Sequence, residues 1–115
     1  MELEVSTLEE LEDSIQVIKK NTEVSLFVTL GNWECPYMNL LIQGTRAYVH
    51  YFSADDEAGF QSIGESESNQ LVTINASQEY SVPEYTLVSL DSALYAAKEF
   101  IEEKSLPISL EWYEL

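Results

Sequence analysis

Three successive segments near the middle of the chain alternate apolar and polar residues, and this pattern limits the possible folds more than any other feature. Every second residue is apolar in residues 24–30, 38–42 and 47–51. A period of two is typical of strands that bury one face. Breaks at Gly31-Asn32 and Gly44-Thr45 favour antiparallel pairing of neighbouring strands through short connections. The middle of the chain therefore predicts an antiparallel meander with one face against a core.

An amphipathic helix is expected before this sheet. Thr7 and Glu10 have the spacing of a capping box, in which each side chain satisfies a backbone amide of the first turn. Lys19 and Lys20 follow in the last turn, where the helix dipole favours positive charge. The apolar side of the helix recurs at helical spacing: Leu8, Leu11, Ile15 and Ile18.

The second half of the chain predicts short strands and one further helix. Strand-forming residues fill 60–63, 71–74 and 78–82. Asp91 is expected to cap the second helix. A terminal strand is expected where apolar residues alternate again, at Ile108, Leu110 and Trp112. This order predicts an α+β fold, a mostly antiparallel β-sheet with two helices packed on one face, in a single domain spanning 1–115.

The charge balance restricts the partners of the chain. Five Lys and Arg stand against 21 Asp and Glu, which gives a net charge of -16. Such a surface repels phosphate, so nucleic acid and anionic membranes are excluded as partners, and a positively charged protein is favoured. The single cysteine excludes an internal disulfide, and the first residues lack the pattern of a secretion signal. We therefore expect a cytoplasmic protein.

Catalytic and metal sites find little support in the residue types. The chain has one histidine, His50, in an expected strand, and one cysteine, Cys35, without nearby positive charge to activate its thiol. Metal-binding Cys and His pairs are missing from the sequence, and residues 58–60 do not continue an acidic calcium loop after Glu57. We expect no enzyme activity, no metal and no cofactor. A pair of carboxylates acting in hydrolysis stays an alternative, which a pH–rate profile would reveal.

Binding to a basic protein is the function class that the residues favour. Tyr and Trp are typical anchors of protein interfaces, and carboxylates pair with Arg and Lys across them. Such residues cluster in expected connections between strands. The predicted partner-contact residues are Glu34, Tyr37, Asp55, Asp56, Glu57, Glu65 and Glu67. A generic acidic adaptor or nucleic-acid mimic is the alternative, and it would bind many basic proteins weakly.

An ordered series of short features carries a resemblance to a known family. It comprises Ala47-Tyr48-Val49-His50-Tyr51-Phe52 before an acidic segment, Phe60-Gln61-Ser62-Ile63-Gly64-Glu65, Val82-Pro83 before Leu87-Val88-Ser89-Leu90, Ala93, Ala97 and Glu99-Phe100 in the second helix, and Pro107 with Trp112. In this order the chain resembles the deaminase-associated immunity protein family (immunity protein family one) of bacterial polymorphic toxin systems. The resemblance runs from about Glu34 to the C-terminus, and Phe60 to Glu65 is similar to the family's aromatic-x-Ser-x-Gly-acid motif. Ser105-Leu106 departs from the glycine and basic residue that the family often has before Pro107.

The resemblance implies a small cytoplasmic antidote against a toxin. Such a protein binds its cognate toxin domain one-to-one and prevents self-poisoning. The self-repulsion of the negative charge predicts a monomer when the chain is free. The toxins that the resemblance implies are often basic nucleic-acid deaminases, and other nuclease-like toxins also occur. A toxin that acts on nucleic acid needs a positively charged groove to hold phosphates. A strongly acidic protein can occupy that groove and so inhibit the toxin.

Overall fold

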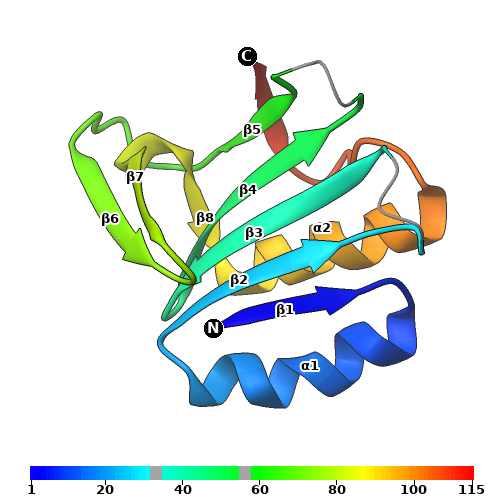
Figure 1. Ribbon diagram of the computed structural model, residues 1–115. Coiled ribbons are helices and arrows are strands. Elements are labelled where there is room, and N and C mark those ends of the chain that lie inside the picture. Colours follow the sequence, from blue (N-terminus) through cyan, green and yellow to red (C-terminus); the bar gives the residue numbers. More distant parts are fainter. Residues whose placement is uncertain (32–34, 55–57) are drawn as a thin grey trace.

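The computed structural model describes residues 1–31, 35–54 and 58–115. Figure 1 shows its elements along the chain. They are β1 (Glu2–Val5), α1 (Leu8–Lys20), β2 (Glu23–Val28), β3 (Tyr37–Gln43), β4 (Arg46–Phe52), β5 (Phe60–Ile63), β6 (Leu71–Asn75), β7 (Glu79–Pro83), the 3-10 turn η1 (Glu84–Thr86), β8 (Leu87–Ser89), α2 (Leu90–Glu103) and β9 (Glu111–Glu114).

The main sheet confirms the expected α+β class. Its strands lie in the order β1-β2-β3-β4-β5-β9, and β8 also pairs with β4. Neighbouring strands are antiparallel except β1 and β2, which run parallel on either side of the crossover helix α1. The predicted meander of β2, β3 and β4 is confirmed. β1 was not expected, because four residues of alternation are too few to distinguish a strand from an irregular terminus.

Both helices pack on one face of this sheet, as predicted, and α2 crosses behind β3 and β4 in Figure 1. The small residues of α2 let the helix lie close to the strands, since Ala93, Ala96 and Ala97 are fully buried. Phe100 fills the space between them and meets the ring of Tyr51 edge to face at 5.9 Å. The strand residues of this core are Val24, Leu26, Val28, Met38, Leu40, Ile42, Ala47 and Val49.

The predicted capping box of α1 is present. The backbone N–H of Glu10 donates to Thr7 Oγ1 at 3.1 Å, and Glu10 Oε1 accepts from the backbone N–H of Thr7 at 3.2 Å. Leu11 and Ile18 of the predicted stripe are buried, while Leu8 and Ile15 are half-buried. The apolar stripe of α1 therefore faces the sheet, as the spacing of its residues predicted.

A hairpin of β6 and β7 covers one end of the opposite sheet face. The side chain of Gln43 donates to the backbone oxygen of Thr73 at 2.8 Å, and the carboxylate of Glu23 accepts from the backbone N–H of Asn75. A second apolar cluster forms underneath: Leu41, Tyr48, Ile74, Ala76, Val82 and Leu87. The rest of this sheet face, which we call the open face, is not covered by the hairpin or by the helices.

Strand β4 changes partner along one edge. Its residues 46–48 pair with β8, and its residues 50–51 pair with β5, so that Val49 falls between the two. The hydroxyl of the buried Ser62 fills this gap: it accepts from the N–H of Val49 at 3.0 Å and donates to the carbonyl of Thr86 at 2.7 Å. At Gly64 a Cβ atom would lie 1.8 Å from the carbonyl oxygen of Leu87. We call this meeting of β4, β5 and β8 the strand junction.

Two predicted boundaries were wrong. The cap of α2 is Ser89, not Asp91, because the Ser89 hydroxyl accepts from the N–H of Ser92 at 3.1 Å, and Asp91 instead lies in the first turn. The terminal strand begins at Glu111, not at Ile108, which is 90% exposed. The indole N–H of Trp112 donates to the carbonyl of Pro107 at 2.7 Å, and this bond closes a turn where the alternation had indicated a strand.

Candidate functional site

Tyr37, one of the predicted contact residues, lies on the open face of the sheet. It is the first residue of β3, and its cross-strand partner is Phe52, the last residue of β4. The two rings are stacked with centroids 4.6 Å apart and planes 15° apart. The short connection between β3 and β4 sets this register and brings the two aromatic side chains together at one end of both strands.

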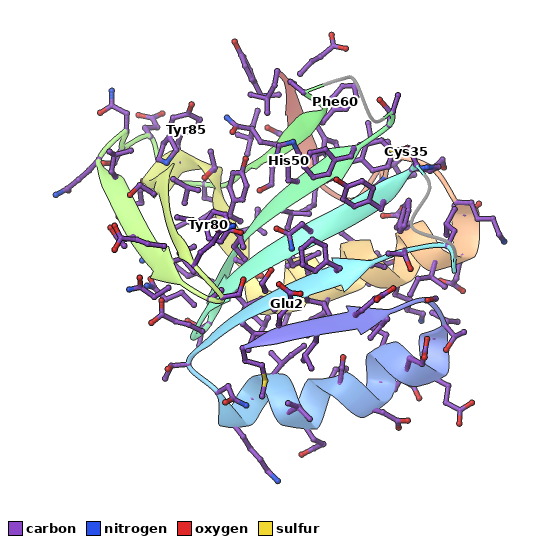
Figure 2. The ribbon with its side chains drawn as sticks, viewed as in Figure 1. Glu2, Cys35, His50, Phe60, Tyr80 and Tyr85 are labelled. Atoms are coloured by element: carbon purple, nitrogen blue, oxygen red, sulfur yellow. The ribbon has the colours of Figure 1, made fainter. Side chains whose placement is uncertain are left out.

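The stack continues along β4 to His50. Side chains two residues apart in a strand share a face, so His50 and Phe52 are neighbours. Their ring centroids are 4.0 Å apart, with an angle of 6° between the planes. All three rings are half-buried, and Figure 2 shows His50 on the face of the sheet away from α2. We call Tyr37, Phe52 and His50 the aromatic stack.

Hydrogen bonds fix the imidazole at the inner end of the stack. His50 Nε2 lies 2.6 Å from the carbonyl oxygen of Ala58, so this nitrogen carries the hydrogen. The hydroxyl of Tyr48 donates to Gln61 Oε1 at 3.2 Å and lies 3.3 Å from His50 Nδ1. Burial lowers the pKa of His50, and the bond to Ala58 opposes that effect. The stack therefore presents an uncharged imidazole at neutral pH.

Tyr48 is the buried member of this network. Desolvation by burial, followed by the nearby Tyr85, raises the pKa of Tyr48 to about 12. A phenol in that environment stays protonated and keeps its hydrogen for Gln61, with His50 Nδ1 beside it. The prediction of His50 as a half-buried strand residue is confirmed, and its ring contacts Phe52, Tyr48 and the carbonyl of Ala58.

Four of the predicted contact residues, Glu34, Asp55, Asp56 and Glu57, lie outside the described residues. The described ends of their connections are Gly31 with Cys35, and Ala54 with Ala58. Because Tyr37 and Phe52 pair at the end of β3 and β4, both connections leave the sheet and return to it at the end that carries the aromatic stack.

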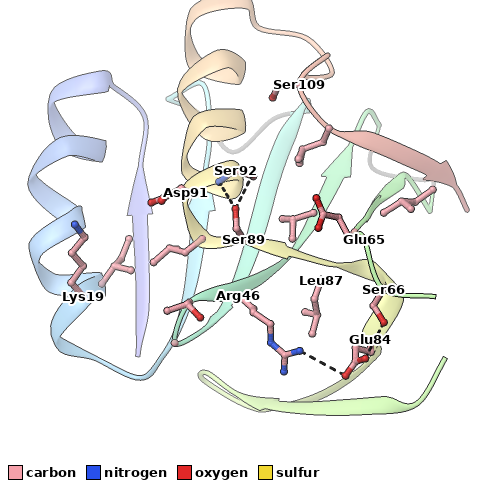
Figure 3. A pocket seen from close by; sticks show the side chains of 18 of the residues that line it. Lys19, Arg46, Glu65, Ser66, Glu84, Leu87, Ser89, Asp91, Ser92 and Ser109 are labelled. Atoms are coloured by element: carbon pink, nitrogen blue, oxygen red, sulfur yellow. Dashed lines mark hydrogen bonds and ion pairs between the residues drawn. The ribbon is translucent and has the colours of Figure 1, made fainter. Parts of the chain in front are cut away.

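Glu65 and Glu67 lie at the other end of the strands. Both are exposed in the segment after β5, and Glu65 lines a groove of about 1300 Å³ that Arg46 also lines (Figure 3). Arg46 is the first residue of β4 and Tyr37 faces the last, so roughly 20 Å of strand separates Arg46 from the position opposite Tyr37. The seven predicted contact residues thus do not form one cluster.

Mixed charges line the groove. Arg46 lies 3.8 Å from a carboxylate oxygen of Glu84, which also accepts from the hydroxyl of Ser66 at 2.9 Å. Lys19 and Lys20 line it too, so three of the five cations of the chain are here. A basic partner would meet repulsion as well as attraction at this groove.

The four lysines all lie on the helix side of the molecule. They belong to α1, to α2 or to the residue that ends α2: Lys19, Lys20, Lys98 and Lys104. The exposed Glu2 and Glu4 of β1 instead point toward the open face, because Leu3 and Val5, which alternate with them, pack against the helix-side core. The open face therefore combines aromatic rings with negative charge, and lysine is confined to the opposite side.

The family-like motif of residues 60–65 has a structural role in its centre. Ser62 and Gly64 build the strand junction, while Phe60 packs against the helix-side core. Glu65 alone of these residues is exposed. The buried centre of the motif thus specifies the framework, and Glu65 is its exposed end.

Sequence reasoning missed Phe52 and His50 as members of the aromatic surface. A signal existed, since a two-residue connection at Gly44-Thr45 places Tyr37 opposite Phe52 and residue 39 opposite His50. Within the described ranges, no group of three His, Cys, Asp or Glu side chains is arranged to hold a metal ion. Neither of the two described helices has the length and apolar composition needed to cross a bilayer.

Comparison with protein families gives one match over nearly the whole chain. The family model described as immunity protein Imm1 matches residues 1–114. Among curated proteins, none matches the chain.

Proposed function

This chain belongs to the immunity protein Imm1 family, and from that premise we propose that it protects against a nucleic-acid deaminase toxin by covering the basic substrate cleft of the toxin. An immunity protein acts by binding its cognate toxin. Beyond this role, we propose the chemistry of the toxin and the way in which its cleft is blocked. A deaminase that acts on nucleic acid must hold phosphates near its reaction site, so its cleft is positively charged.

The distribution of charge is the observation that supports the mechanism. A net charge of -16 steers the chain toward a basic partner, and the lysines lie on the helix side. A basic cleft that approached the helix side would meet these lysines among the acidic residues of α1 and α2, whereas the open face offers Glu2 and Glu4 without a lysine. Complementary fields raise the association rate and suppress wrong orientations.

We assign the predicted contacts to two groups. Tyr37, with Glu34 and the run Asp55-Asp56-Glu57, forms the primary group, because its connections meet the sheet at the aromatic stack. Glu65 and Glu67 contribute long-range attraction from the other end. The carboxylates pair with Arg and Lys of the toxin, and Tyr37 supplies apolar contact. The complex is one-to-one and cytoplasmic, and the free chain is a monomer because its charge is self-repelling.

Co-expression with the neighbouring gene product tests the proposal. The C-terminal domain of the protein encoded immediately upstream is produced with and without this chain, and cell survival, complex formation and deamination of single- and double-stranded DNA and of RNA are measured. We expect toxicity that this chain relieves, a tight one-to-one complex and deamination that stops on its addition. An upstream-encoded domain that is harmless, or toxicity that persists when this chain is present, would refute the pairing of this chain with that domain. A toxin without deaminase activity would refute the assigned chemistry alone.

Charge reversal separates the immunity role from that of a generic acidic adaptor. Changing Asp55, Asp56 and Glu57 together to lysine should lower the association rate with the toxin and weaken its dependence on salt. The matched control reverses Glu102 and Glu103 at the exposed end of α2. Equal, weak and salt-sensitive binding to an unrelated basic protein such as lysozyme would favour the adaptor.

A further inference from the structure

The main sheet ends at β9, and among the described residues no further strand lies beyond it. Figure 1 shows β9 at this edge of the sheet, beside β5. We propose that the outer edge of β9 binds an extended basic segment of the toxin, which adds a strand to the sheet. This inference rests on the proposed immunity function and adds to it the place and the kind of contact.

The pairing of β9 with β5 decides which of its backbone groups point outward. The N–H of Leu115 donates to the carbonyl of Gly59 at 2.9 Å, so Leu115 turns its backbone groups toward β5. Successive residues of an antiparallel strand point these groups to alternate sides. Those of Tyr113 therefore also face β5, and those of Trp112 and Glu114 face away from it. The outward N–H and C=O groups form an edge that an added strand can pair with.

The side chains of β9 fit a segment that is basic and partly apolar. Trp112 packs against the helix-side core, so Glu114 lies on the same side of the sheet, while Glu111 and Tyr113 lie on the other side. Both glutamates are exposed, and Tyr113 is 56% exposed. Cross-strand neighbours contact each other. A toxin strand that carries Lys or Arg opposite the carboxylates and an apolar residue opposite Tyr113 therefore matches this edge.

The charges around β9 favour such a strand over a second copy of this chain. After α2 the chain has one cation, Lys104, against the two glutamates of β9. The groove that Glu111 lines is mixed in charge, since its other charged residues are Lys19, Lys20, Arg46, Glu65, Glu84 and Asp91. Two copies joined through β9 would bring like glutamates together between molecules that each carry a charge of -16. A basic strand meets attraction in place of this repulsion.

The edge of β9 also lies next to a predicted contact segment. Gly59, which accepts from Leu115, follows the acidic run of residues 55–57 by two positions in the chain. The opposite edge of the sheet, β1, is separated from β5 by β2, β3 and β4. One toxin can therefore contact the β9 edge together with the primary group of contacts, which is not so for the β1 edge.

Amide hydrogen exchange tests the proposal on the ¹⁵N-labelled chain, alone and bound to the upstream-encoded toxin domain. Exchange at Trp112 and Glu114 should slow by roughly tenfold or more in the complex, because these N–H groups then donate to the added strand. The matched control is Ser81, whose N–H points away from β6 at the edge of the hairpin, and its exchange should not change. Unchanged exchange at Trp112 and Glu114 in a complex that forms, or protection of Glu2 and Glu4 instead, would overturn the proposal.

Proline at position 114 separates the backbone contact from the charge of the side chain. Glu114→Pro removes an outward N–H, and edge strands tolerate proline, so urea unfolding should show that the fold is kept. This variant should bind the toxin domain roughly tenfold more weakly or worse, whereas Ser81→Pro should stay within about twofold of the parent. Glu114→Gln keeps the N–H and should lose less affinity than Glu114→Pro.

Equal losses for Glu114→Pro and Glu114→Gln would overturn the backbone pairing, as would a dimer of the free chain that Glu114→Pro dissociates in sedimentation. If the proline variant does not fold, the exchange measurement on the parent chain still decides. Failure of the parent chain to bind the toxin domain would instead refute the proposed function.

Discussion

Removal of the Ser62 hydroxyl should destabilise the protein far more than the loss of one oxygen atom suggests. Ser62 is fully buried, and its hydroxyl accepts from Val49 and donates to Thr86. In Ser62→Ala a backbone N–H and a carbonyl both lose this partner inside the strand junction. Each buried polar group left unpaired costs about 1–3 kcal/mol, so we expect the free energy of unfolding to fall by about 3 kcal/mol. That is a large share of the stability of a typical domain.

Urea unfolding followed by tryptophan fluorescence measures this loss directly. The urea concentration at the midpoint of unfolding should fall, while the slope of the unfolding free energy against urea concentration should stay the same. The melting temperature should fall by roughly 10 °C. Ser81→Ala is the matched control, since Ser81 is exposed in β7, and it should change stability by less than about 0.5 kcal/mol. A loss below about 1 kcal/mol for Ser62→Ala would show that Val49 and Thr86 do not depend on this hydroxyl, and the account of the strand junction would fail.

Three further changes test other parts of the fold. Gly64→Ala forces a Cβ atom against the carbonyl of Leu87, so we expect a loss of several kcal/mol, measured as soluble yield and urea midpoint; parent-like stability would contradict the close approach. Thr7→Ala removes the cap of α1 and should cost about 1 kcal/mol in the same assay. Burial lowers the pKa of His50 in the folded state, so the unfolded chain binds a proton on this imidazole at higher pH than the folded chain does. The free energy of unfolding should therefore decrease as the pH falls from 7.5 to 6. His50→Gln should reduce that decrease, and an equal decrease in the variant would refute this reasoning.

The local parts of the fold were predictable from the sequence. The alternation of β2, β3 and β4 and the capping box of α1 arise from residues close together in the chain, so their pattern is visible without a structure. The docking of the hairpin was not predictable, because Glu23 meets Asn75 and Gln43 meets Thr73 across long stretches of chain. Contacts of this kind leave no periodic signal.

The surface chemistry was predictable only in part. Sequence reasoning selected Tyr37 because it is an aromatic residue close to acidic residues in the chain. The stack also depends on the pairing of Tyr37 with Phe52, which is set by the register of two strands. The sequence does not indicate how far residues 65 and 67 lie from Tyr37, because charge alone does not show at which end of the sheet an acidic segment lies. Sequence reasoning selected residue types for the candidate site, and the sheet decides which of them are neighbours.

The strand junction and the exposed residues of the open face differ in what the fold demands of them. Ser62 and Gly64 join β4, β5 and β8 in the interior, while the side chains of Glu2 and Glu4 are exposed. On the proposed function, substitutions of such exposed residues would change the match to the cognate protein at little cost in folding. On such a framework a toxin and its antidote can co-adapt by stepwise exchange of surface residues, and new matched pairs can arise without a new architecture.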